Sequence, residues 1–164
     1  MNKESISLFE VRLADENDVS SIIEITGEAF LKYKEMTGAT VLDALEETPE
    51  DVKRDIQTKL VLIAMSEGES VGCVRVEVRP DNTAYLTRFA VKVTNQNNGI
   101  GKSMMNHVDK MMQKRGIKKI SLYTASKAAS LMRFYYGRGF YVESTDTVRG
   151  YIRAKLVKDY VLGC

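Results

Sequence analysis

Residues 85–116 have the sequence YLTRFAVKVTNQNNGIGKSMMNHVDKMMQKRG, which predicts a strand, a short loop and a helix. Residues 85–93 are rich in β-branched and aromatic side chains, which favour a strand. Residues 94–98 are turn-forming. From Gly99 onward, apolar residues recur at helical spacing as far as Gly116, where a glycine commonly ends a helix.

Two glycines, Gly99 and Gly101, stand at the predicted start of this helix. A glycine has no Cβ, so a ligand can approach its backbone closely. The first N–H groups of a helix lack intrahelical partners, and the helix dipole makes that end positive. This arrangement indicates a phosphate site, to which Lys102 could add a charge. The alternative is a glycine-rich connector without a ligand, because short glycine patterns are common.

The spacing Gln96-x-x-Gly99-x-Gly101, after a strand containing Phe89-Ala90-Val91, resembles the acetyl-CoA motif of the GCN5-related N-acetyltransferase (GNAT) superfamily. A second segment, FYYGRGF at residues 134–140, resembles the family's Leu-Tyr-x-x-x-Gly-Phe segment. A dinucleotide-binding motif is not matched, because the third spaced glycine is absent. A P-loop is not matched either, because Gln96 stands in place of its first glycine. The resemblance covers residues 9–157.

The resemblance implies an α/β (α+β) fold in a single N-acetyltransferase domain, residues 1–164. Its central sheet is mixed and mostly antiparallel, with splayed parallel fourth and fifth strands, and helices flank it. The patterns predict strands over 8–13, 60–65, 70–79, 85–93, 118–124, 140–145 and 151–157. They predict helices from Asp15 to about Phe30, weakened near its end by Gly27, from Thr48 to Lys59, over 99–116 and over 126–137, with a short helix and a loop within 31–48. Composition alone indicates only α/β or α+β.

Composition excludes several classes of protein. The chain has 164 residues, a net charge of +2 and no Lys/Arg-rich run, which argues against a nucleic-acid partner. No apolar run approaches membrane-spanning length, and the N-terminus lacks the apolar core of a signal peptide. The two cysteines, Cys73 and Cys164, form neither a disulfide framework nor a metal site. We therefore expect a cytoplasmic protein without a membrane, nucleic-acid or metal partner.

The cosubstrate implied by the resemblance is acetyl-CoA. Its pantetheine arm would be flanked by Phe89, Ala90, Val91 and Val93. Its pyrophosphate would be held by the backbone amides of Gln96, Asn97, Asn98, Gly99, Ile100, Gly101, Lys102 and Ser103. The family often has Gly-Lys or Gly-Arg where this chain has Asn97-Asn98, so a side-chain charge on the phosphate is lost there. Lys102 either compensates for that loss or is simply solvated.

The chemistry implied is direct attack of a neutral amine on the acetyl thioester within a ternary complex. It requires a base for the amine proton, backbone donors for the carbonyl oxygen and an acid for the departing thiolate. The position of the family's acid is occupied by Tyr135. The alternative is that Tyr135 belongs only to an aromatic cluster with its neighbours.

The base is not assigned by sequence. Histone-modifying members of the family place a glutamate on the fourth strand, where this chain has Tyr85. Glu28 and Glu77 are the remaining carboxylates that we would test near the substrate. His107, the single histidine, lies at the edge of an apolar helical stripe and is interpreted as structural.

The acceptor is expected to be a small-molecule or peptide amine, and a homodimer is allowed for. Residues 43–55 carry six acidic side chains against Lys53 and Arg54. They form either an acidic wall that attracts a cationic amine or a solvated helix face. Two other functions stay open: a non-catalytic acetyl-CoA sensor, and a protein-interaction domain on the same fold.

Overall fold

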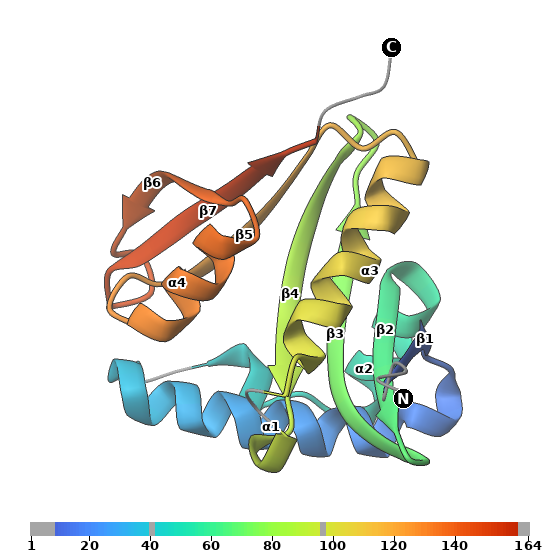
Figure 1. Cartoon of the computed structure of the whole chain (residues 1–164). Helices are drawn as coiled ribbons and strands as arrows, with labels where there is room; N and C mark the ends of the chain where they lie inside the picture. The colour runs from blue at the N-terminus through green and yellow to red at the C-terminus, as the bar shows by residue number, and fades with distance from the viewer. Residues whose placement is uncertain (1–8, 40–41, 96–97, 161–164) are drawn as a thin grey trace, which may run out of the picture.

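The structure is a computed structural model that describes residues 9–39, 42–95 and 98–160. Its centre is a seven-stranded sheet in the order β1-β2-β3-β4-β5-β7-β6 (Figure 1). The strands are β1 (Glu10–Leu13), β2 (Leu60–Ser66), β3 (Glu69–Val78), β4 (Thr83–Val91), β5 (Lys119–Ala125), β6 (Tyr141–Asp146) and β7 (Arg153–Asp159). The helices are α1 (Val19–Thr37), α2 (Pro49–Thr58), α3 (Ile100–Lys114) and α4 (Ala129–Gly137), with 3-10 turns η2 (Glu16–Asp18), η3 (Asp43–Leu45) and η4 (Val93–Asn95).

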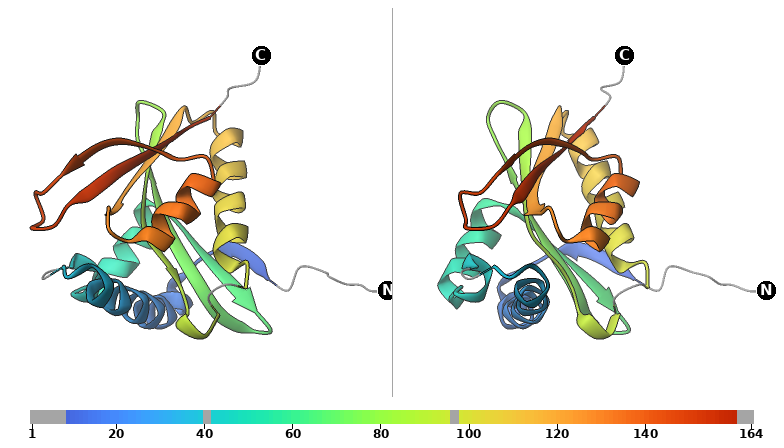
Figure 2. Two further views of the ribbon diagram at one scale, coloured as in Figure 1. Left: turned by 60° about the vertical axis from the view of Figure 1, so that its left-hand side comes forward. Right: turned by 90° about the vertical axis from the view of Figure 1, so that its left-hand side faces the viewer.

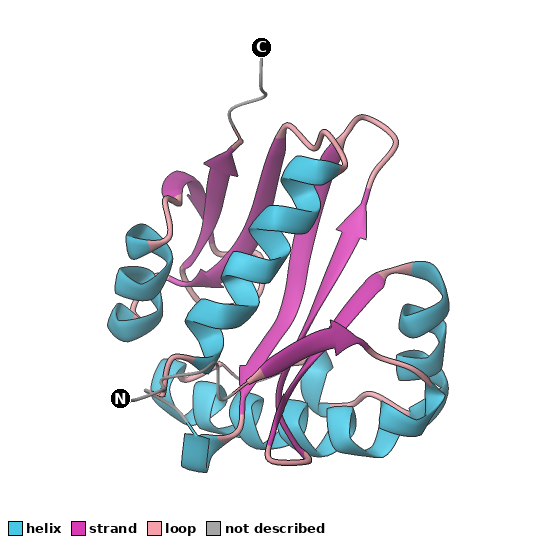
Figure 3. Ribbon diagram, turned by 45° about the vertical axis from the view of Figure 1, so that its right-hand side comes forward, coloured by secondary structure: helices cyan, strands magenta, loops and turns pink. Residues whose placement is uncertain are grey.

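The two faces of the sheet carry separate apolar cores, because successive side chains of a strand point to opposite faces. Leu62 and Ala64 of β2 pack in the core that contains α3. Val61 and Ile63 pack in the core that contains α1 and α2. Figure 2 shows α1 and α3 on opposite sides of the sheet, and in Figure 3 α3 crosses in front of the strands. The continuous apolar run of β2 is thereby buried on both faces.

The parallel pair of strands confirms the predicted splay. Pairing between β4 and β5 runs only from Thr83 with Lys119 to Tyr85 with Ser121, and every other neighbouring pair is antiparallel. Beyond Tyr85 the two strands diverge, as Figure 1 shows. The hairpin β6–β7 and helix α4 follow β5 away from β4. Beyond Tyr85, the divergence therefore leaves one backbone edge of β4 without pairing to β5.

A bulge interrupts β4 in the diverging region. Cys73 pairs with Ala90 and Arg75 with Thr87, so one residue of β3 lies opposite two residues of β4. Arg88, within the bulge, has a φ of 54°, which is unfavourable for a residue with a side chain. The bulge therefore sets the direction of Arg88, a feature the sequence pattern did not predict.

The first helical region differs most from expectation. The predicted cap Asp15 is present, and it forms a capping box with Asp18 before a short 3-10 turn. The helix does not weaken near Gly27, however, but continues to Thr37 and ends at Gly38 with a φ of 73°. The second helix does begin at Thr48, which caps it through a box with Asp51. Tertiary packing of the apolar face of α1 outweighs the roughly 1 kcal/mol cost of an internal glycine.

Smaller corrections concern the ends of elements. The strand predicted over 85–93 begins earlier and ends at Val91, so Val93 belongs to the 3-10 turn η4 rather than to the strand. Within 31–48 the described part contains the end of α1 and one turn of 3-10 helix. The last helix begins at Ala129 rather than at residue 126. Such shifts of one to three residues are typical of boundaries set by packing.

Candidate active site

A cleft of about 730 Å³ lies where β4 and β5 diverge. We call it the main cleft. Its walls come from α1, the start of η3 with the residue before it, β4, the start of α3, the end of β5, α4 and the β6–β7 turn. Three segments far apart in sequence therefore meet at it: Tyr33 of α1, Phe89 of β4 and Tyr151 of the hairpin.

The start of α3 opens onto one end of the main cleft. Gly99 is the N-cap residue with a φ of 81°, a left-handed conformation that glycine adopts without strain. Gly101 lies in the first turn, and a Cβ added there would meet Phe89 and Phe134 at 3.4 to 3.5 Å, which is ordinary contact. Gly99, Gly101 and Lys102 line the cleft. Gly99 is therefore favoured by its left-handed backbone conformation, whereas a side chain at Gly101 would pack against Phe89 and Phe134 at the wall of the cleft.

The other residues proposed for the phosphate loop are placed as follows. Gln96 and Asn97 lie outside the described residues. Asn98 is exposed before the helix, whereas the side chain of Ile100 is buried and packs in the core with α3. Only the backbone of Ile100 can therefore face a ligand. Ser103 does not line the cleft, and its amide donates to the carbonyl of Gly99.

The residues proposed to flank the pantetheine arm are mostly in the main cleft. Phe89, Ala90 and Val91 line it on β4. Val93 does not, because it lies in the turn η4 and its side chain is exposed. Its backbone N–H donates to Oε1 of Glu28 at 2.8 Å.

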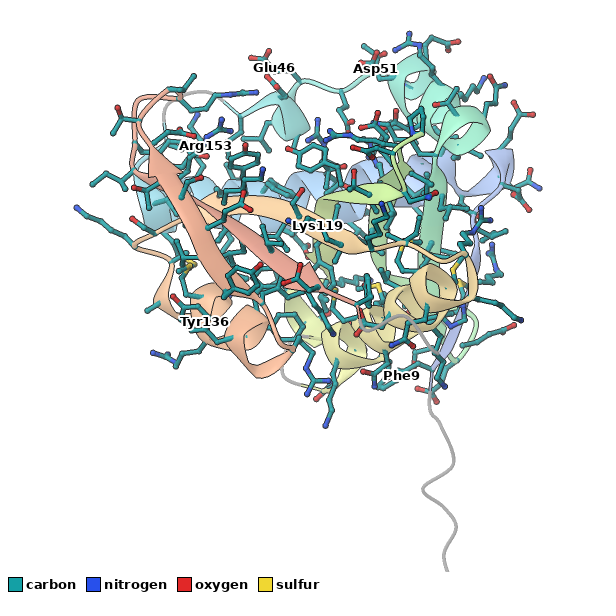
Figure 4. All side chains as sticks on the ribbon, turned by 90° about the horizontal axis from the view of Figure 1, so that it is seen from above. Phe9, Glu46, Asp51, Lys119, Tyr136 and Arg153 are labelled. Carbon is teal, nitrogen blue, oxygen red and sulfur yellow. The ribbon has the colours of Figure 1, made fainter. Side chains whose placement is uncertain are left out.

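Tyr135 lines the main cleft and is 5% exposed. Its ring packs edge-on against Phe89, Phe134 and Phe140, with centroids 5.3 to 6.1 Å apart. Burial raises the pKa of the Tyr135 hydroxyl well above its ordinary value, because the phenolate would lose hydration. The hydroxyl is therefore kept protonated. Tyr135 is thus a member of the aromatic cluster and also lines the main cleft. The next residue, Tyr136, is 49% exposed on the outer side of α4 (Figure 4).

The three positions considered for the substrate or the base fall in different places. Tyr85 lines the main cleft, with its ring edge-on to Tyr123 at 6.1 Å. Glu28 does not line the main cleft. Its carboxylate instead accepts a hydrogen bond from the backbone N–H of Val93. Glu77 lies outside it and pairs with Arg79 at 3.5 Å near the solvent. His107 is partly exposed on α3, as interpreted from the sequence.

A sequence profile described as "Acetyltransferase (GNAT) family" matches residues 28–140, more than half of the chain. The chain belongs to the GNAT family. This span contains both motifs, the start of α3 and the Tyr135 segment.

Relatives of known name support the assignment. Spermidine N(1)-acetyltransferase of Thermoplasma acidophilum is 32% identical over 87 residues, which are 53% of this chain and 53% of the relative. The match thus spans about half the length of that curated relative. The crystal structure of the paia N-acetyltransferase from Thermoplasma acidophilum, in complex with coenzyme A, superposes with a TM-score of 0.81 at 25% identity, covering 93% of this chain and 99% of that one. An IAA acetyltransferase from Bacillus cereus shares the fold at 15% identity and a TM-score of 0.70, covering 93% and 99% of the two chains.

The main cleft of this GNAT chain also contains residues that the sequence analysis did not identify. The hydroxyl of Tyr33 accepts a hydrogen bond from the backbone N–H of Ala125 at 2.7 Å. Burial, followed by its interaction with Tyr151, raises the pKa of Tyr33 to about 12. Oγ1 of Thr124 is buried at the cleft wall without a hydrogen-bond partner among the described residues. Tyr33 lies in the second half of α1. A prediction that this helix continues past Gly27 would have placed Tyr33 on it.

Of the six acids in the segment 43–55, only Asp43 lines the main cleft. Both oxygens of Glu47 accept from the buried guanidinium of Arg75, whose Nη1 also donates to Asp55 at 2.8 Å. Their side chains are only 9% and 18% exposed. Glu46 and Asp51 lie along the outer rim in Figure 4, and Asp51 serves as a helix cap. Of the two alternatives from the sequence, the six acids do not form one wall of the main cleft, and they are not one solvated face either, because Glu47 and Asp55 are mostly buried against Arg75.

Among the described residues, no cluster of three or more His, Cys, Asp or Glu side chains is arranged to hold a metal ion. In the same part of the chain, no helix combines the length and apolarity needed to cross a bilayer.

Proposed function

We propose that this chain is an acetyl-CoA-dependent N-acetyltransferase that transfers the acetyl group to a primary amine by direct attack in a ternary complex. The observation that carries this proposal is the continuity of the main cleft. One hollow joins the glycine start of α3, the edge of β4 beyond its pairing with β5, and the wall that contains Tyr135.

The residues present fit acetyl-CoA. The amides at the start of α3 suit a pyrophosphate, since they combine free N–H groups with the positive end of the helix dipole. Lys102, Arg133 and Arg138 line the cleft on the side of α3 and α4, where they suit phosphate charge. Beyond Tyr85, β4 has an edge to which the amide groups of a pantetheine arm could bond, because pairing with β5 stops there. The paia N-acetyltransferase structure, similar over most of this chain, contains coenzyme A.

The reaction forms a C–N bond at the acetyl carbonyl carbon and breaks the C–S bond. Tyr135 would donate its proton to the sulfur as it leaves, since its raised pKa keeps the hydroxyl protonated. Backbone N–H groups of β4 near the bulge would stabilise charge on the carbonyl oxygen. The amine must lose a proton, and no described carboxylate of the cleft except Asp43 is available for it. Asp43 is exposed and pairs with Arg149 at 3.2 Å, so we assign no side-chain base.

A small amine is the class of acceptor that we propose. The curated relative from Thermoplasma acidophilum is named for spermidine, a small amine. The main cleft is also lined by α1, the start of η3 and the β6–β7 turn, and we propose that the amine binds on this side.

The test is release of free CoA thiol from acetyl-CoA in the presence of a panel of primary amines, with acetylated products identified by mass. Amine-dependent release with a matching product is the expected result. Binding of CoA without release for any amine would favour the sensor instead. Absence of CoA binding would favour the protein-interaction domain.

A further inference from the structure

Thr124, near the end of β5, places a buried hydroxyl at the wall of the main cleft. The residue is 4% exposed, and its Oγ1 forms no hydrogen bond with any described residue. Buried polar groups of folded proteins are nearly always paired, because an unpaired one loses hydration without compensation. Thr124 therefore marks a point of the cleft wall that suits a ligand able to form a hydrogen bond.

The other buried polar atoms without a hydrogen bond belong to side chains that have partners. The Nε atoms of Arg75 and Arg88 are of this kind, but both guanidinium groups pair with Glu47. Arg88 lines the main cleft and also a second cavity of about 360 Å³ beside α2, where its charge is balanced by acids. Among the described residues, Thr124 is thus the buried side chain whose whole polar group has no hydrogen bond.

Tyr33 of α1 brings a second hydroxyl to the same corner of the cleft. Its oxygen accepts a hydrogen bond from the backbone N–H of Ala125, the residue after Thr124, at 2.7 Å. Thr124 lies close enough to this oxygen to lower the pKa of Tyr33, against the larger effect of burial, although the two hydroxyls are not in hydrogen-bond geometry. A hydroxyl oxygen has two lone pairs, so one remains on Tyr33 after the Ala125 bond. We call Tyr33 and Thr124 the hydroxyl pair.

The hydroxyl pair connects the proposed acceptor side with the proposed acid. On the acceptor side, Tyr33 interacts with Tyr151 of the β6–β7 turn, and both line the cleft. On the other side, Tyr33 adds to the effect of burial in raising the pKa of Tyr135, so the two hydroxyls interact through space. The edge proposed for the pantetheine arm belongs to β4, across the divergence from β5. The position of the pair therefore favours the attacking amine over the pantetheine arm as its ligand.

We propose that Thr124 and Tyr33 bind the acceptor as a neutral primary amine, each hydroxyl oxygen accepting one of its two N–H groups. This inference rests on the proposed function. The nitrogen lone pair is then left free for the thioester carbonyl carbon, and the nitrogen is held in position for attack. Neither hydroxyl is charged, so the pair does not stabilise the ammonium form as a carboxylate would. A secondary amine has a single N–H and engages only one of the two oxygens.

The test compares benzylamine with N-methylbenzylamine as acceptors at saturating acetyl-CoA. In the wild type, kcat/KM should be higher for benzylamine. Thr124→Val keeps nearly the same shape and removes the hydroxyl, so kcat/KM for benzylamine should fall about three- to tenfold, as for one neutral hydrogen bond. The secondary amine can direct its single N–H to Tyr33 instead and should lose less, so the ratio of the two values should fall. An unchanged ratio would overturn the proposal and leave the proposed acetyltransfer intact.

Stability distinguishes binding from a structural role. Because the Thr124 hydroxyl makes no hydrogen bond with a described residue, Thr124→Val should unfold at an equal or higher urea concentration. Thr124→Ser keeps a hydroxyl and should retain the wild-type ratio of the two amines. The matched control is Thr26→Val, because Thr26 is equally buried but lies outside the main cleft, with Oγ1 3.6 Å from Sγ of Cys73. Its ratio should not change. Earlier unfolding of Thr124→Val, with equal losses for both amines, would show that the hydroxyl is structural.

Equilibrium binding separates this inference from the proposed function. Calorimetry of benzylamine with the CoA-bound protein at mildly alkaline pH should show binding that weakens about three- to tenfold in Thr124→Val, with CoA affinity unchanged. This readout needs no turnover, so if CoA binds and no amine is acetylated, the proposed function fails and the amine site is still decided. Benzylamine binding that is absent in the wild type, or undiminished in the variant, would overturn the amine site. A loss of CoA affinity in Thr124→Val would assign the hydroxyl to the cosubstrate and overturn it as well.

Discussion

At the scale of single residues, Tyr135 offers the sharpest test of mechanism. Tyr135→Phe keeps a buried ring that packs against three phenylalanines and removes only the hydroxyl. We expect turnover to fall by roughly 10²-fold or more, the usual strength of acid catalysis, with little change in acetyl-CoA affinity. Because the pKa of Tyr135 is raised, the wild-type hydroxyl stays protonated through the neutral and mildly alkaline range. The measurement is kcat under conditions where chemistry limits the rate.

The matched control is Tyr136→Phe. Tyr136 is 49% exposed and lies outside the main cleft, so its hydroxyl should not affect turnover. Equal turnover in the wild type and Tyr135→Phe would remove Tyr135 from the mechanism.

Arg75 is a second residue whose effect can be predicted. Its side chain is 1% exposed and bonds to Glu47 and Asp55. Arg75→Met would leave two mostly buried carboxylates with only Arg88 and Lys59 as cationic partners. Breaking a buried ion pair in this way costs about 3–5 kcal/mol, so the free energy of unfolding in urea should fall by about that amount. Arg54→Met, which removes an arginine that is 65% exposed, should change it by less than about 0.5 kcal/mol. A loss below about 1 kcal/mol for Arg75→Met would mean that the network contributes little to stability.

At the scale of elements, the start of α3 separates two roles of glycine. Gly101 is helical and a Cβ there has ordinary contacts, so Gly101→Ala should fold with equal or higher stability. Its CoA affinity should nevertheless fall about tenfold or more, because the Cβ occupies space next to the amides that would hold phosphate. Calorimetry with CoA and urea unfolding measure the two effects separately. Undiminished CoA affinity would place the pyrophosphate elsewhere.

The comparison variant at this element is Gly99→Ala. Gly99 has a φ of 81° with no atom nearer than 4.0 Å to an added Cβ, so the cost is conformational rather than steric. We expect a loss of about 1–2 kcal/mol in the free energy of unfolding. The two glycines should thus respond in opposite directions in stability.

At the scale of the whole molecule, CoA should stabilise the fold by joining parts that the splay separates. The main cleft is lined from both sides of the divergence between β4 and β5. A ligand at about a hundred times its dissociation constant adds roughly 2.7 kcal/mol. For a chain of this length the melting temperature should rise by several degrees. No shift at millimolar CoA would contradict this prediction.

The sequence by itself determined the family and much of the fold. Local signals have local causes: the caps Asp15 and Thr48 satisfy helix N–H groups, and the apolar run of β2 must be buried on both faces. The glycine spacing before α3 and the segment around Tyr135 were sufficient to recognise the GNAT family and to expect a splayed parallel pair. The caps and the apolar run act within a few residues of the chain. The two motifs are informative because they recur in one fold family.

Only the tertiary structure decided what faces the acceptor. The acids of 43–55 appeared available in sequence, but Glu47 and Asp55 are bound to Arg75 from a strand far along the chain. The continuation of α1 past Gly27 brings Tyr33 to the end of β5, and the bulge in β4 places Arg88 between two cavities. The length of α1 is decided by packing along its whole apolar face, and the position of Arg88 is decided by the pairing of β4 with β3. The charge of a site depends on which groups neutralise each other in space, and residue spacing along the chain does not record that.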